Sequence, residues 1–283
     1  MIKELELKAL DLRKRIIKVS YVSGAGHITS SLSSVDIFNA LYAGKLLRFD
    51  SGAPNWPDRD RFILSKGHAT LAFYNVLCDA GFVTQKEVNT FCQRGSHFGG
   101  LTTTSVAGVE CYSGSLGHGL SFAVGAALCA RVQNKDYLTF ALSGDGECHE
   151  GSIWEAAMSI TQFNLTNLIW IIDKNDMQLS GRVPEIINLN PLADKLEAFG
   201  FETKTIDGHS YEDLLSALKI DRNRLPSRPL AVIANTVKGK GVPYLENRLG
   251  WHGKKPDKTE LSIIIEQLGM TTEELDEFNE KYI

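Results

Sequence analysis

The fold of this 283-residue chain is decided by one stretch, Leu138-Thr139-Phe140-Ala141-Leu142-Ser143-Gly144-Asp145-Gly146. Its first five residues are apolar or β-branched, which is typical of a strand that is buried on both faces. A glycine-rich turn follows, then a helix expected at about residues 152–163, and then a second apolar run at residues 168–172. A strand, a helix and a second strand in this order predict a βαβ unit with parallel strands.

The same alternation continues on both sides of this unit. Further strands are expected at residues 61–65, 201–206 and 230–234, and further helices at residues 2–23, about 34–42, 69–80, and after the capping residue Ser210. This pattern predicts a doubly wound α/β domain, in which a mostly parallel sheet carries helices on both faces. We assign residues 1–253 to this domain and residues 254–283 to a helical C-terminal tail.

The composition argues against several classes of protein. The net charge is −4 and no block of five like charges occurs, so no nucleic-acid-binding patch is expected. Five cysteines without a CxxC pair argue against a disulfide framework and favour a reducing cytoplasm. The mixed charges at the N-terminus do not resemble a signal peptide. Residues 111–130 carry no charged side chain, but their glycines and serines predict a loop that leads into a buried helix, rather than a membrane span.

Three polar turns follow predicted strands, namely Lys66-Gly67-His68, Gly144-Asp145-Gly146 and Asp173-Lys174-Asn175. Because the carboxyl ends of parallel strands meet at one edge of a sheet, we expect Asp145 and Asn175 to lie close together. A carboxylate and an amide oxygen suit Mg²⁺ or Ca²⁺ and do not suit zinc. The glycines let the backbone approach a diphosphate, so we infer a metal-bridged diphosphate as the ligand.

These residues also resemble a known family. The run Gly144-Asp145-Gly146-Glu147-Cys148-His149-Glu150-Gly151, with the later Asp173-Lys174-Asn175, is similar to the thiamine diphosphate motif of transketolases. The same family is indicated by five further stretches, which are GH at 26–27, LSKGHA at 64–69, GSLGHG at 114–119, KGKGV at 238–242 and WHG at 251–253. The resemblance covers the diphosphate-binding domain only. It therefore implies the N-terminal, cofactor-binding subunit of a split transketolase.

The resemblance also implies roles for individual residues. The metal ligands would be the side chains of Asp145 and Asn175 and the backbone carbonyl of Met177. His27 and His252 would transfer protons at the donor sugar, and Glu150 would lie at the subunit interface. The residues that would bind the cofactor are His68, Gly114, Leu116, Gly146, Asn175, Leu179 and His252. Leu116 and Leu179 would hold the thiazolium ring between them. Near-neutral imidazoles suit proton transfer at physiological pH.

The activity implied is the transfer of a two-carbon ketol unit from a ketose or its phosphate to an aldose or its phosphate, with thiamine diphosphate and Mg²⁺. The glutamate that activates the cofactor belongs to the family's pyrimidine-binding domain, so a partner subunit with the pyrimidine-binding and C-terminal domains would have to supply it. An α₂β₂ assembly is expected.

Two departures from the family pattern leave the substrate open. Gly99-Gly100-Leu101 stands where transketolases carry Gly-His-Pro, and His118 stands where glutamine is common. These changes favour an altered sugar specificity. The motifs are also compatible with the α-subunit of a different thiamine diphosphate enzyme and with a non-catalytic paralogue that only binds the cofactor.

Overall fold

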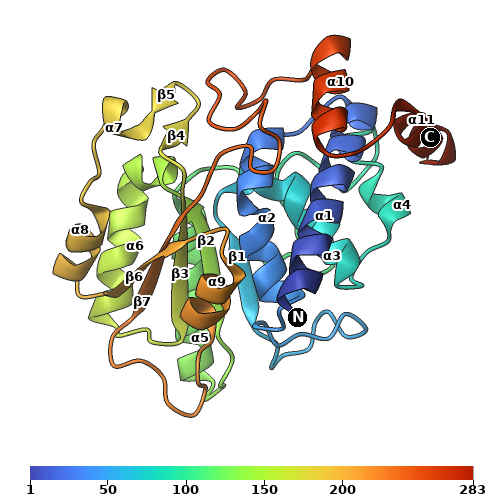
Figure 1. The fold of residues 1–283 in the computed structure, drawn as a ribbon. Helices are drawn as coiled ribbons and strands as arrows, with labels where there is room; N and C mark the ends of the chain where they lie inside the picture. The colour runs from blue at the N-terminus through green and yellow to red at the C-terminus, as the bar shows by residue number, and fades with distance from the viewer. Residues whose placement is uncertain (283) are drawn as a thin grey trace.

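A five-stranded parallel sheet forms the centre of the molecule (Figure 1), in a computed structural model that describes residues 1–282. The strand order is β1-β2-β3-β7-β6. The strands are β1 (Arg61–Leu64), β2 (Thr139–Gly144), β3 (Leu168–Lys174), β6 (Glu202–Asp207) and β7 (Leu230–Asn235). Each overlaps a strand predicted from the sequence, and every neighbouring pair is parallel.

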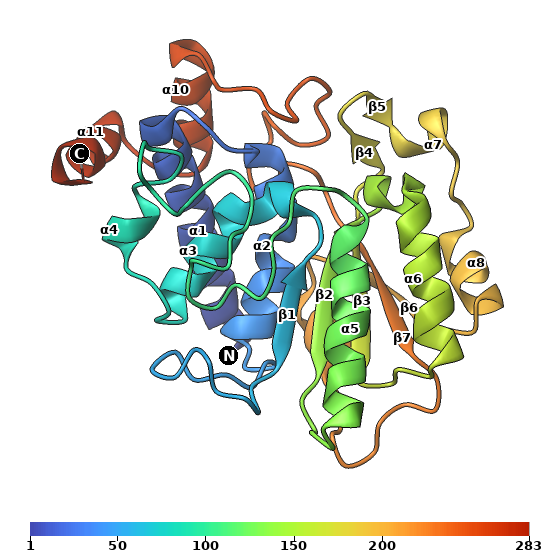
Figure 2. The same cartoon turned by 180° about the vertical axis from the view of Figure 1, so that it is seen from behind.

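Helices cover both faces of the sheet, which confirms the doubly wound prediction (Figures 1 and 2). One face carries α1 (Ile2–Ser23), α2 (Ile28–Tyr42), α3 (Thr70–Asp79) and α9 (Tyr211–Leu218). The other face carries α5 (His118–Val132), α6 (Gly151–Gln162) and α8 (Leu192–Ala198). The cap predicted for α9 is confirmed, because the Ser210 hydroxyl accepts a hydrogen bond from the Asp213 N–H.

Two hydrophobic cores lie on opposite sides of the sheet, because alternate residues of each strand point to opposite faces. On β2, Phe140 and Leu142 belong to the core beneath α1, α2 and α3, whereas Ala141 belongs to the core beneath α5 and α6. On β3, Ile171 and Trp170 divide in the same way. The central strands read as continuous apolar runs because they are buried on both sides.

Helix α2 begins at Ile28, so the predicted start near residue 34 is wrong. Serines usually compete with helical backbone bonds, and a run of them occupies the first turns of this helix. Here the hydroxyls of Ser33 and Ser34 reach the Ser30 carbonyl one turn earlier and also the carboxylate of Asp173. These tertiary partners make serine acceptable inside a buried helix.

Helix α5 is buried on one face only, so the prediction of a buried helix in this region holds for half of its surface. Leu120, Ala123 and Ala127 are buried, whereas Phe122 is 54% exposed. Within residues 1–282, no helix has both the length and the apolar character needed to cross a membrane.

The remaining elements are short or lie near the C-terminus. They are η1 (Gly67–Ala69), α4 (Gln85–Val88), η2 (Gly146–His149), β4 (Met177–Gln178), β5 (Gly181–Arg182), α7 (Val183–Ile186), α10 (Lys258–Gln267) and α11 (Thr272–Tyr282). Strands β4 and β5 form an antiparallel hairpin that the sequence did not predict. Leu261 and Ile264 of α10 and Leu275 of α11 join the core that contains α1.

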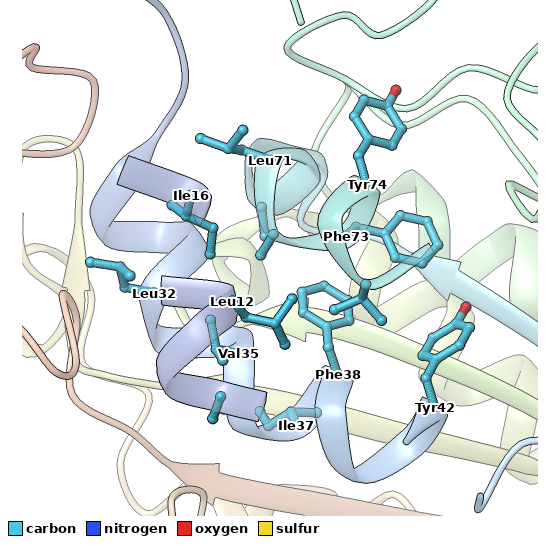
Figure 3. Close-up of a cluster of buried hydrophobic side chains, with 14 of the residues drawn as sticks. Leu12, Ile16, Leu32, Val35, Ile37, Phe38, Tyr42, Leu71, Phe73 and Tyr74 are labelled. Atoms are coloured by element: carbon cyan, nitrogen blue, oxygen red, sulfur yellow. The ribbon is translucent and has the colours of Figure 1, made fainter. Parts of the chain in front are cut away.

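Aromatic side chains of α2 and α3 pack in one buried cluster (Figure 3), and Phe38 also contacts the sheet. The ring of Phe38 stacks on that of Phe73 at 5.6 Å between centroids, and it meets Phe62 of β1 edge to face at 5.7 Å. Offset and edge-to-face pairs of this kind add stabilisation beyond the apolar area that they bury.

Phe38→Ala should therefore lower the free energy of unfolding by about 3–5 kcal/mol, because it removes the ring and leaves a cavity. Denaturant unfolding followed by circular dichroism measures this change. The control is Leu7→Ala on α1, whose side chain is 70% exposed, and it should change stability by no more than about 0.5 kcal/mol. Equal losses in the two variants would contradict this account of the core.

Candidate active site

Asp173, near the end of β3, joins several elements through one buried carboxylate. It accepts hydrogen bonds from the Lys66 ammonium after β1, from Ser33 and Ser34 of α2, and from Thr236 after β7. Burial alone would raise the pKa of Asp173, but the Lys66 charge and the hydroxyl donors hold it well below its usual range. Asp173 is therefore ionised, and it fixes the loops at the carboxyl edge of the sheet.

The same carboxylate orients Asn175. The Asn175 amide donates to Asp173 Oδ1 at 3.3 Å, while its amide oxygen accepts from the Met177 N–H at 3.2 Å. Across from it, the carboxylate of Asp145 accepts from the N–H groups of Gly146 at 2.9 Å and Asp176 at 2.6 Å. The loops after β2 and β3 are thus bonded to each other at the side chains that the sequence paired.

These residues border a cavity of about 170 Å³ at the carboxyl edge of the sheet. Its walls come from the ends of β1, β2 and β3, from the loop before α5, and from the segments around residues 238 and 252. The lining residues are Ser30, Lys66, His68, Leu116, Gly144, Asp145, Gly146, Glu147, Asn175, Met177, Gln178, Leu179, Lys238 and His252. The three predicted metal ligands therefore share one cavity with five further predicted cofactor contacts, which are His68, Leu116, Gly146, Leu179 and His252.

The donor set in this cavity fits a hard divalent cation. Burial raises the pKa of Asp145 to about 6, and the nearby charge of Asp173 acts in the same direction. A cation at this carboxylate would offset both effects, because it favours the ionised form. The neighbouring Asn175 oxygen and Met177 carbonyl are the oxygen ligands that Mg²⁺ and Ca²⁺ accept.

Three histidines lie together beside these oxygens. The ring centroids are 5.2 Å apart for His27 and His252, 5.1 Å for His68 and His252, and 5.8 Å for His27 and His68. Burial lowers the pKa of all three, to about 3 for His252 and well below the usual value for His68, and the charges of Lys66 and Lys238 add to the effect. Neutral imidazoles can each offer one N–H donor and one acceptor nitrogen.

Lys238 projects into the same cavity. Its ammonium lies 3.4 Å from the Met177 carbonyl and 3.1 Å from Nδ1 of His252. Within residues 1–282, Lys238 forms no ion pair with a carboxylate. Burial and the charge of Lys66 lower its pKa to about 8. The cavity therefore contains a cation that an anionic ligand would stabilise.

Glu147 holds the loop before α5 against the sheet. Its buried carboxylate accepts from Ser65 Oγ at 2.5 Å and from the N–H groups of Gly117 at 2.8 Å and Gly144 at 3.1 Å. Gly119 makes this close packing possible, because a Cβ at that position would lie 2.5 Å from the Cα of Ser65. The arrangement brings Leu116 to the cavity wall.

Three residues singled out from the sequence do not line the cavity. The His27 ring contacts the rings of His68 and His252, which do line the cavity. Gly114 lies beside Leu101, whose Cδ1 would be 2.9 Å from a Cβ at position 114. Glu150 is exposed at the start of α6.

Sequence reasoning missed six cavity residues, which are Ser30, Lys66, Gly144, Glu147, Gln178 and Lys238. Several of them fall inside the quoted motifs, as Lys66 does in LSKGHA and Lys238 does in KGKGV. Their place inside these motifs was the sequence signal by which they could have been found. Ser30 gave no such signal, because it lies in a run of serines that was placed outside the helix.

The chain matches the family model described as "Transketolase, thiamine diphosphate binding domain" over residues 10–282. It belongs to the transketolase family. The match includes the cavity and all the residues of its wall, so this chain carries the thiamine diphosphate-binding domain of that family.

Relatives and solved structures agree with this assignment. The chain is 37% identical to one subunit of the apulose-4-phosphate transketolase of Phocaeicola vulgatus, over 98% of either chain. It is also 37% identical to the 6-deoxy-6-sulfo-D-fructose transketolase subunit SqwG of a Clostridium species, over 89% of this chain and 91% of that one. The transketolase structure from Campylobacter jejuni superimposes with a TM-score of 0.88 at 30% identity, and this chain spans 46% of that protein's length.

Lys66→Met should lower the free energy of unfolding by about 3–5 kcal/mol, because it leaves the buried carboxylate of Asp173 without its charged partner. The control is Lys174→Met, which removes a lysine that pairs with the 40% exposed side chain of Asp176 and should cost no more than about 1 kcal/mol. Denaturant titration of both variants measures the difference. If the two losses were the same, Asp173 would not hold the sheet edge together.

Proposed function

We propose that this chain binds thiamine diphosphate and Mg²⁺ in the cavity at the carboxyl edge of the sheet, and that with a partner subunit it transfers a two-carbon ketol unit between sugars. The observation that carries this proposal is the grouping of three oxygen ligands, Asp145, Asn175 and Met177, with neutral histidines and Lys238 in one cavity. When bound, the cofactor supplies a nucleophilic thiazolium carbon and an electron sink for cleaving the bond next to a ketose carbonyl.

The polar groups of the cavity fit a metal-bound diphosphate. His68 and His252 can donate N–H groups to phosphate oxygens, and Lys238 brings a positive charge. A side chain at Gly146 would be crowded, since a Cβ there would lie 3.0 Å from the Cβ of Gln178. The buried hydroxyl of Ser30 has no hydrogen-bond partner among the described residues, and a ligand in the cavity would give it one.

Two leucines form what we call the apolar rim of the cavity, Leu116 and Leu179. They are 36% and 70% exposed. We assign them to the faces of the thiazolium ring, because apolar walls would disfavour its charged form relative to neutral products. Their exposure supports a wall that is completed by another chain.

His27 and His252 are assigned to proton transfer at the hydroxyl groups of the donor sugar. Both imidazoles are held neutral by burial and by the charge of Lys238. A neutral imidazole can accept a proton from a hydroxyl group as a ketose is cleaved and return it to the acceptor. The Met177 side chain is buried, which fits the use of its carbonyl alone.

A partner subunit completes the enzyme in this proposal. The relatives from Phocaeicola vulgatus and Actinobacillus succinogenes are each named as one subunit of a transketolase, and this chain covers nearly all of each. We propose that the partner contributes the pyrimidine-binding and C-terminal domains, that Glu150 lies at the interface, and that the assembly is α₂β₂ in the cytoplasm. Residues 1–253 would form the cofactor-binding domain, with residues 254–283 as its helical extension.

The substrate is proposed only as a class, a ketose donor and an aldose acceptor or their phosphates. The relatives from Phocaeicola vulgatus and the Clostridium species act on apulose-4-phosphate and 6-deoxy-6-sulfo-D-fructose according to their names. An altered donor specificity is supported by Leu101, which is 47% exposed and packs beside Gly114 where transketolases carry a histidine-containing segment.

Co-purification with the partner tests the activity. The complex should convert a panel of ketose and aldose phosphates only when thiamine diphosphate and Mg²⁺ are both present, and treatment with EDTA should abolish turnover until Mg²⁺ is restored. The chain alone should be inactive, because no residue in it is assigned to activate the cofactor. Full turnover by the isolated chain would refute the need for a partner.

Asp145→Asn should weaken binding of the Mg²⁺–thiamine diphosphate pair at least about tenfold, because it removes the only anionic ligand assigned to the metal. Isothermal titration calorimetry on the complex gives the affinity. Asp176→Asn is the matched control, since this neighbouring carboxylate pairs with Lys174 at 2.7 Å and it should leave the affinity within about twofold. Equal affinities for the Asp145 variant and the wild type would sink the assigned metal site.

A further inference from the structure

The segment after β7 carries Lys238 into the cavity. Residues 236–241 leave the sheet and turn twice through glycines with positive φ, 85° at Gly239 and 90° at Gly241. Glycine permits many backbone conformations, and bonds to other segments select the one adopted here. The Gly239 N–H donates to the Thr29 carbonyl at 3.0 Å, and the Lys238 carbonyl accepts from the Asn247 N–H at 2.9 Å. The position of the segment is therefore set by contacts with the rest of the protein.

Two side chains hold this segment on either side of Lys238. The N–H of Val237 donates to Nε2 of His209 at 2.8 Å, and the carbonyl of Lys240 accepts from Nε of Arg13 at 3.0 Å. His209 lies between β6 and α9, while Arg13 lies on α1. The residue before Lys238 and the second residue after it are thus each bonded to a different part of the fold.

One buried carboxylate joins the two side chains. Oδ2 of Asp36 on α2 accepts from Nη2 of Arg13 at 2.6 Å and from Nδ1 of His209 at 2.7 Å. Oδ1 of the same residue accepts from the hydroxyl of Tyr211 at 3.1 Å. Because Nδ1 donates to Asp36, Nε2 of a neutral His209 is free to accept from Val237, so the carboxylate also selects the tautomer that the segment needs.

The buried charge of Lys238 is the reason why this segment needs to be held in place. Its ammonium is buried near the Lys66 ammonium and close to three imidazoles, without a carboxylate partner among the described residues. Desolvation and repulsion both favour movement of this charge toward water. A glycine-containing segment would allow that movement unless it were fastened on both sides.

We propose that Asp36, Arg13 and His209 form a clamp that positions the Lys238 segment for the cofactor's phosphates, with His209 as the positioning residue closest to Lys238. The clamp rests on the proposed function for its role, but its geometry belongs to the chain itself. None of its three members lines the cavity wall.

Two substitutions of His209 test the hydrogen bonds of its two ring nitrogens separately. His209→Asn keeps a donor near Asp36 and loses the acceptor for the Val237 N–H, whereas His209→Gln can place an acceptor near Val237 and loses the bond to Asp36. If the clamp acts through Val237, the asparagine variant should be the more damaging of the two. A residue that merely ties helices together through Asp36 would give the reverse order.

Hydrogen–deuterium exchange of the full chain without cofactor tests the geometry. His209→Asn should speed exchange in peptides that cover residues 236–241 by about tenfold, with α1 and α2 unchanged, and His209→Gln should stay closer to the wild type. Asp36→Asn combined with His209→Asn should speed exchange in the segment further, because it also loosens Arg13, the second arm of the clamp. Unchanged exchange in the segment, or faster exchange everywhere, would overturn the clamp.

Calorimetric titration of the complex with Mg²⁺ and thiamine diphosphate tests the role. His209→Asn should weaken cofactor binding about tenfold and leave kcat at saturating cofactor within about twofold, while His209→Gln should restore most of the affinity. Equal affinities for wild type and His209→Asn would refute the role in cofactor binding. A wild-type complex that binds no thiamine diphosphate would refute the proposed function as well, and the exchange experiment would still decide the geometry.

Discussion

The structure depends on a negative charge held in the interior by Asp173. A carboxylate that is fully buried would be costly, but here an ammonium and several hydroxyl groups supply its hydrogen bonds. These donors come from α2, from the end of β1 and from the end of β7, so the charge can be satisfied only when all three have assembled around β3. The carboxyl edge of the sheet is therefore shaped by one electrostatic requirement.

That edge brings oxygen ligands and a buried ammonium together in one cavity, a combination that suits a metal-bound anion. The oxygens of Asp145, Asn175 and Met177, which we propose as cation ligands, share one cavity with the ammonium of Lys238, which lies 3.4 Å from the Met177 carbonyl. The imidazoles of His68 and His252 in the same cavity are kept uncharged by burial and by the nearby lysines. Burial disfavours the charged forms of Asp145 and Lys238 relative to water, so the surrounding protein has to hold these side chains in place.

The sequence predicted those parts that follow from local patterns. Four of the five sheet strands could be located because burial on both faces produces continuous apolar runs, whereas the edge strand β6 is polar and partly exposed. Asp145 and Asn175 could be paired because parallel strands end at a common edge. The start of α2 could not be predicted, since its serines are acceptable there only through Asp173. The clamp around His209 was missed for a similar reason, because its members are far apart in the sequence and no local pattern links them.

The apolar rim has a consequence for the cell as well as for chemistry. Leu116 and Leu179 remain in contact with water when nothing covers them, and exposed apolar surface promotes unspecific association. Copies of the chain made in excess over whatever covers the rim would be the first to be lost to aggregation or proteolysis. In the proposed complex, matched synthesis of the chain and its partner would therefore limit these losses.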